Sequence, residues 1–165
     1  NRNFLLENKL QFPPLRVYED PIFLLCTLLK AKEYYAVPDV VYRYNGTHSN
    51  KRITLACTKD YLRGLIAELK LSKKKDLPEI HTLCCDRLMR EADFYAQRFL
   101  KTEDPELLAL LLEANAAVSP QLLKDPPENG SVILPALRTI WHAGCRYLRW
   151  RDQRIIRTLC DVFVK

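Results

Sequence analysis

The stretch DPELLALLLEANAA, residues 104–117, decides the fold class of this chain. Asp104 is a favoured helix N-cap residue, and Pro105 suits the first helical position, where a missing N–H costs nothing. The leucine-rich run over residues 107–112 has high helix propensity. The stretch therefore predicts a buried helix rather than a cofactor-binding segment.

Similar start signals recur along the chain. Asp20 and Ser119 each precede a proline, and Asp76 lies three residues before Glu79, the spacing of a capping box. Apolar periodicity from these starts predicts the remaining helices. Together with 105–117, the predicted helices cover 21–33, 54–72, 77–101 and 131–164. We therefore expect a mainly α fold.

The β signal of the chain is confined to residues 34–44, which are rich in tyrosine and valine and interrupted at Pro38. They predict two short strands. Because two strands do not make a stable sheet alone, we expect this piece to be the edge of a larger, missing sheet. The predicted organisation is a small α/β piece over 1–50 followed by a helical bundle-like segment over 51–165.

Composition excludes several classes of protein. Hydrophobic residues make up 48% and charged residues 28%, as in ordinary soluble domains. The 4 glycines are far apart, which excludes a Walker loop or a GxGxxG turn within these residues. Residues 114–123 form the longest stretch without a charged side chain, and a membrane-spanning helix needs about 20 apolar residues. We expect no membrane span.

The 6 cysteines show no CxxC spacing and no dense pattern, so they indicate neither a zinc site nor a disulfide framework. Reduced thiols in a cytosol are the simplest interpretation. His81, Cys84, Cys85 and Met89 share one predicted helix, but their spacing matches no recurrent metal site. Apolar packing of Leu83, Leu88 and Phe94 explains this helix better, so we expect its side chains to pack in the core.

The net charge of +6 is concentrated in residues 138–165, which contain seven basic residues and two acidic ones. This uneven distribution argues against a nucleic-acid-binding domain. On a helical wheel Arg146, Arg154 and Arg157 lie with Trp150 opposite the apolar side. This face either contacts anionic lipid headgroups or a protein partner, or is a solvated face with arginine stacked on Trp150.

Glu19 and Asp20 are adjacent carboxylates at the junction between a loop and a helix. Two interpretations stay open. An Asp before a proline at a helix start is an ordinary N-cap. A carboxylate at a helix N-terminus is also stabilised as an anion, which suits a general base.

Arg43 and His48 follow the second predicted strand. A histidine at a strand end can bind a metal or a phosphate, and an arginine can pair with an anion. A metal site needs several convergent ligands, however, and a single histidine in a polar turn is more often simply exposed.

Taken in order, these features resemble the closing part of family 2 glycosyltransferases with the GT-A fold. The likeness runs over residues 3–65. It rests on the order and spacing of Phe-Pro at 12–13, Tyr-Glu-Asp at 18–20, a Tyr/Val strand, Val-Tyr-Arg-Tyr at 41–44, and then His48.

The resemblance implies an inverting transfer of a sugar. Asp20 matches the general base beside the acceptor, with Glu19 next to it, while Arg43 and His48 match residues near the donor diphosphate and the metal, with His48 as a metal ligand. The family binds Mg²⁺ or Mn²⁺ through an upstream Asp-x-Asp motif, which this sequence lacks. We therefore expect a C-terminal fragment that is inactive and metal-free without its nucleotide-binding part.

The resemblance also implies the partners of the complete protein. They are a nucleotide-sugar donor and a glycan or lipid-linked acceptor in surface polysaccharide or glycolipid synthesis, without nucleic acid. The expected location is the cytoplasm, at the inner face of the membrane if the basic C-terminal helix contacts lipid. The alternative is a non-enzymatic helical interaction module whose basic helix binds a protein or an anionic membrane surface.

Overall fold

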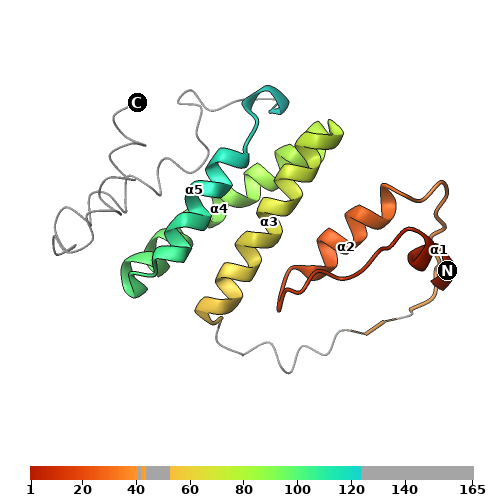
Figure 1. Ribbon diagram of the computed structural model, residues 1–165, viewed down its shortest axis with the longest axis horizontal. Coiled ribbons are helices and arrows are strands. Elements are labelled where there is room, and N and C mark those ends of the chain that lie inside the picture. The colour runs from red at the N-terminus through yellow and green to blue at the C-terminus, as the bar shows by residue number, and fades with distance from the viewer. Residues whose placement is uncertain (41, 44–52, 124–165) are drawn as a thin grey trace. The chain divides into compact units, whose positions relative to one another are not determined.

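The computed structural model describes residues 1–40, 42–43 and 53–123 (Figure 1). Helices account for the regular structure in these ranges. They are α1 (Arg2–Glu7), α2 (Glu19–Leu28), α3 (Leu55–Lys75), α4 (Pro78–Thr102), α5 (Pro105–Ala117) and the 3-10 helix η2 (Pro120–Leu122). The prediction of a mainly α fold is confirmed for the described part of the chain.

The two predicted strands are not formed in the described residues. Residues 34–40 and 42–43 belong to no strand, and residues 41 and 44 lie outside the described ranges. Pro38 has no N–H to donate to a ladder, and no neighbouring strand is present in these ranges to pair with the segment. Tyr34, Tyr35 and Tyr42 are left 80%, 85% and 77% exposed.

Three helices begin and end close to their predicted positions. α3, α4 and α5 match the predicted 54–72, 77–101 and 105–117 within a few residues. The Asp104 side chain accepts a hydrogen bond from the N–H of Leu107 at 2.8 Å, which confirms it as the N-cap of α5. The helix predicted over 131–164 lies outside the described residues.

Two other predicted caps are wrong. α2 begins at Glu19 with Tyr18 as its N-cap, so Asp20 lies inside the first turn. Pro21 is tolerated there because N–H groups of the first turn have no intrahelical acceptor. Asp76 has a left-handed φ of 52° and ends α3 instead of starting α4. The N–H of Leu77 reaches the carbonyl of Ser72 at 2.9 Å, as in a Schellman motif.

The chain divides within α3 into two compact units, Asn1–Gly64 and Leu65–Lys165. The predicted boundary between residues 50 and 51 lies outside the described residues and stays a prediction. In the second unit, α4 packs against α5 and η2, and Lys70 of α3 forms an ion pair with Glu113 of α5 at 2.6 Å. Its largest fully buried side chains are Leu65, Leu69, Leu88, Tyr95, Phe99, Leu107 and Leu111.

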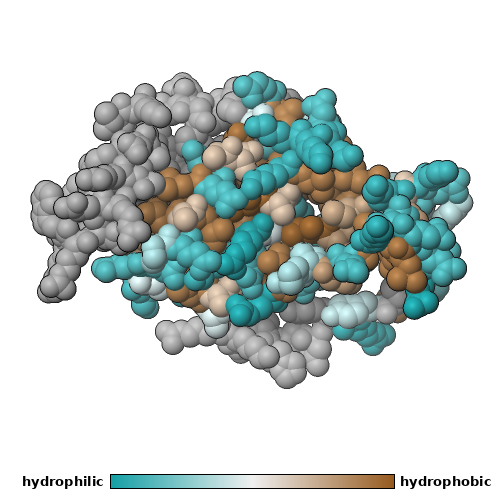
Figure 2. Space-filling model, in the orientation of Figure 1, coloured by the Kyte–Doolittle hydropathy of each residue, from teal (hydrophilic) through white to brown (hydrophobic). Residues whose placement is uncertain are grey.

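Hydrophobic side chains also reach the surface. Figure 2 shows hydrophobic residues, in brown, between the hydrophilic ones on the face in view. In the first unit Leu24 and Leu28 of α2 are 58% and 46% exposed. Among the described helices, none combines the length and the apolarity that crossing a membrane requires.

Candidate functional site

The acidic junction, which we define as residues 16–20, opens α2. Glu19 is half-buried and Asp20 is exposed, both in the first turn of the helix. The structure shows no side-chain capping bond at this helix start. Within the described residues, neither carboxylate forms a hydrogen bond or an ion pair. Both carboxylates lie at the N-terminal, positive end of the helix dipole.

Tyr18 fixes the backbone that leads to Glu19 and Asp20. Its φ of 69° and ψ of 14° are left-handed, an unusual conformation for a bulky residue. The side chain is buried, with its ring edge-on to that of Tyr61 at 4.5 Å between centroids. It also covers Gly64 so closely that a Cβ there would lie 2.5 Å from Cδ1 of Tyr18. A strained residue persists only where its surroundings hold it.

Asp60 of α3 binds Arg16, the first residue of the acidic junction. Its Oδ2 accepts the backbone N–H of Arg16 at 3.2 Å and lies 3.5 Å from the guanidinium of that residue. Its Oδ1 accepts a bond from Arg63, one turn further along α3. The carboxylate is buried, so the two arginines compensate a charge that would otherwise be costly. The acidic junction is thus attached to α3 at Arg16 and at Tyr18.

The role of Asp60 could not be predicted from the sequence. The spacing of Asp60 and Arg63 on one predicted helix was visible, but Arg16 is 44 residues away. Tyr18 carried no sequence signal for a left-handed backbone.

The other predicted site residues are not brought to the acidic junction in the described part of the chain. Arg43 is exposed and forms no hydrogen bond or ion pair with Glu19 or Asp20. His48 lies outside the described residues, as does the whole basic face. The residues of that face are Arg146, Trp150, Arg154 and Arg157. Among described residues, no three His, Cys, Asp or Glu side chains are placed to hold a metal ion.

His81 of α4 is fully buried in the second unit and joins three segments. Its Nε2 accepts the backbone N–H of Ser119 at 2.9 Å, so the proton of the neutral ring resides on Nδ1. Nδ1 then donates to Oγ of Ser72 at 2.9 Å, and this hydroxyl donates to the carbonyl of Leu69 at 3.0 Å. Both ring nitrogens are satisfied, which indicates a structural histidine.

Burial lowers the pKa of His81 from its ordinary value of 6.5. The positive charge of Lys73 lowers it further, and an interaction with the backbone of Leu69 opposes both effects. A neutral imidazole is the form that the Ser119 hydrogen bond requires.

Cys84 and Cys85 are buried beside it in α4. Burial raises the pKa of each thiol to about 12, and Glu68, which accepts a 3.6 Å hydrogen bond from Sγ of Cys84, adds to the shift for that residue. Thiols held protonated are neither nucleophiles nor good metal ligands. The expectation of core packing is confirmed for His81, Cys84, Cys85 and Leu88. It is wrong for Leu83, Met89 and Phe94, which are 55%, 46% and 42% exposed.

Comparison of the chain with protein-family models, with curated proteins and with solved structures gives no match.

Proposed function

We propose that this chain is the C-terminal, acceptor-side part of an inverting glycosyltransferase of the family 2 type, with Asp20 as the general base. One observation carries the proposal. Asp20 is an exposed carboxylate without a hydrogen bond or ion pair among the described residues, and it follows a strained Tyr18 that is held against α3. Strain of this kind is concentrated at functional sites, where it positions a neighbouring group.

The chemistry of such a base is a single displacement. The acceptor hydroxyl oxygen attacks the anomeric carbon of the donor sugar and forms the new C–O bond, while the bond to the diphosphate breaks on the opposite face. Asp20 takes the hydroxyl proton during the attack, and the nucleoside diphosphate leaves with the bonding electrons. Attack from the opposite face inverts the configuration at that carbon.

The anchoring of the acidic junction supports this role for Asp20. A general base acts only within hydrogen-bond reach of the proton that it takes. Asp60 and Tyr61 of α3 hold Arg16 and Tyr18, and so fix the backbone entering α2. We infer that Glu19, half-buried beside Asp20, raises the negative charge of the site.

The resemblance implies a divalent metal at the donor diphosphate, but the described residues include no set of ligands for it. In this proposal, metal and nucleotide binding belong to an upstream part of the complete protein. The exposed Tyr34, Tyr35 and Tyr42 support a missing upstream sheet, since large apolar side chains on an extended segment usually face a partner.

A second candidate function is a non-enzymatic helical interaction module. It is favoured by the second unit, where α4 and α5 pack together over a buried core and the described residues include no strand. In this case the predicted basic face of residues 146–157 binds a protein or an anionic membrane. Salt-sensitive binding of the chain to vesicles of anionic phospholipid supports this candidate, and equal binding to neutral vesicles contradicts its membrane form.

Turnover by the complete protein tests the leading proposal. Release of nucleoside diphosphate is measured with a panel of sugar nucleotides, Mg²⁺ or Mn²⁺, and glycan or lipid-linked acceptors. Acceptor-dependent release with inversion at the anomeric carbon supports the glycosyltransferase. Absence of release with every donor, from a protein that is folded, favours the interaction module.

A further inference from the structure

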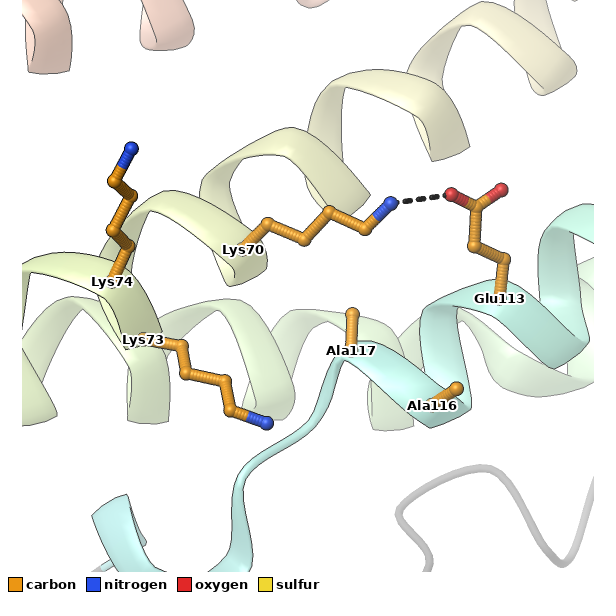
Figure 3. A pocket seen from close by; sticks show the side chains of 6 residues that line it. All are labelled: Lys70, Lys73, Lys74, Glu113, Ala116 and Ala117. Atoms are coloured by element: carbon orange, nitrogen blue, oxygen red, sulfur yellow. Dashed lines mark hydrogen bonds and ion pairs between the residues drawn. The ribbon is translucent and has the colours of Figure 1, made fainter.

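A lysine-lined hollow lies in the second unit between the last turns of α3 and α5, and we name it the lysine hollow (Figure 3). Its volume is about 460 Å³, within the range of roughly 300–1,000 Å³ typical of small-molecule sites. Lysine side chains of α3 and the methyl groups of two alanines of α5 form the walls. The lining residues are Lys70, Lys73, Lys74, Glu113, Ala116 and Ala117.

The charges of the lysine hollow are unbalanced. The ammonium of Lys70 reaches across to Glu113 and pairs with it at 2.6 Å, as Figure 3 shows. Lys73 and Lys74 have no carboxylate partner among the described residues. Two positive charges are therefore left at this site.

We propose that the lysine hollow binds a small organic molecule that carries a phosphate monoester. Such a phosphate has a charge of about −1.5 to −2 at neutral pH, which matches the two uncompensated lysines better than a single carboxylate does. Its oxygens accept hydrogen bonds from the ammonium groups of Lys73 and Lys74. The organic part lies against Ala116, Ala117 and the lysine stems. This inference is independent of the glycosyltransferase proposal.

The flexibility of lysine limits the affinity. The ammonium groups of Lys73 and Lys74 extend in different directions in Figure 3, so at least one side chain must turn to reach a shared phosphate. Ordering a long side chain has an entropic cost. We expect weak but saturable binding.

A competing explanation for these lysines is the helix dipole. Lys73, Lys74 and Lys75 form the basic last turn of α3, where cations offset the negative end of the helix. Lys75 shares this role but does not line the lysine hollow. Lys75→Gln is therefore a matched control, because it removes one charge from the same turn and leaves the lining residues unchanged.

The test is an isothermal titration of the chain with glycerol 3-phosphate at one fixed ionic strength, with inorganic phosphate and glycerol titrated in parallel. The wild type is expected to bind glycerol 3-phosphate with one saturable site, more tightly than inorganic phosphate, and not to bind glycerol. Lys73→Gln and Lys74→Gln are each expected to weaken this binding by about fivefold or more, and Lys75→Gln by less than about twofold.

A second variant tests the place of binding without a change of charge. Ala116 is exposed, so Ala116→Leu narrows the lysine hollow without disturbing the core, and it is expected to weaken binding of glycerol 3-phosphate by about fivefold or more. Circular dichroism confirms that each variant is folded. The proposal is overturned if the wild type shows no saturable binding of glycerol 3-phosphate. It is also overturned if Lys75→Gln weakens binding as much as Lys73→Gln and Lys74→Gln do, or if Ala116→Leu leaves binding unchanged.

Discussion

The backbone N–H of Ser119 donates a hydrogen bond to Nε2 of His81 at 2.9 Å, across 38 residues of sequence. Both residues are buried. This bond attaches the segment that follows α5 to the first turn of α4, and it is formed only by a neutral imidazole. The bond contributes to the stability of the second unit, and this contribution depends on pH.

Replacement of His81 by Phe is expected to destabilise the chain by about 1–3 kcal/mol. The ring shape is retained, but the buried N–H of Ser119 loses its acceptor and Oγ of Ser72 loses its donor. Urea denaturation measures the effect. Gln97→Ala, an exposed change on the same helix, serves as the control. A His81→Phe protein as stable as the wild type shows that the hydrogen bond contributes nothing.

Acid is expected to remove the contribution of the His81–Ser119 hydrogen bond to stability. The folded-state pKa of His81 is below its ordinary value of 6.5, so the unfolded chain takes up the proton first as pH falls. The stabilisation is therefore complete above pH 6.5 and decreases below it, until the folded-state pKa is reached. The difference in unfolding free energy between wild type and His81→Phe should shrink over this window. A constant difference from neutral pH to acid would refute the linkage.

Gly64→Ala is expected to destabilise the first unit, although alanine is the better helix former by about 1 kcal/mol. The new methyl group would lie 2.5 Å from Cδ1 and 3.1 Å from Cβ of Tyr18. Overpacking of this kind costs about 1–3 kcal/mol, and the buried ring cannot move without losing its contact with Tyr61. Urea denaturation gives the sign, and a stabilised Gly64→Ala variant would show that Tyr18 is loosely held.

Cys84 and Cys85 are expected to resist alkylation. With pKa values raised to about 12, they carry on the order of a thousandfold fewer thiolates near pH 8 than ordinary thiols do. The half-buried Cys26 and Cys57 supply the internal comparison. Peptide mapping after brief iodoacetamide treatment of the native chain should find Cys26 and Cys57 modified first. Equal labelling of the four cysteines in the native chain would contradict the burial of Cys84 and Cys85.

Features that depend on neighbouring residues in the sequence could be predicted. The Asp104 cap, with its 2.8 Å bond to Leu107, lies within one turn, and α5 matches its predicted range. The prediction for Asp76 is wrong because a residue between two closely spaced helices can either end the first or begin the second. It lies between α3 and α4, and the tight turn places it at the end of the first.

Features that depend on distant partners could not be predicted. The acidic junction is held by Asp60, 44 residues from Arg16, and by the contact of Tyr18 with Tyr61. The residues next to Tyr18 in the sequence do not indicate its left-handed backbone. The prediction of two strands over 34–44 is wrong for a related reason. A strand forms only when another strand pairs with it, and the described residues around 34–43 contain no such partner.

The most direct test of the central claim is the rate of nucleoside diphosphate release by the complete protein carrying Asp20→Asn. Asparagine keeps the shape of Asp20 but cannot take the acceptor proton. The control is Asp93→Asn, which makes the same change at an exposed position on α4. We predict a loss of about a hundredfold or more for Asp20→Asn in a folded protein, with Asp93→Asn unchanged. Wild-type turnover by Asp20→Asn would contradict the assignment of the general base.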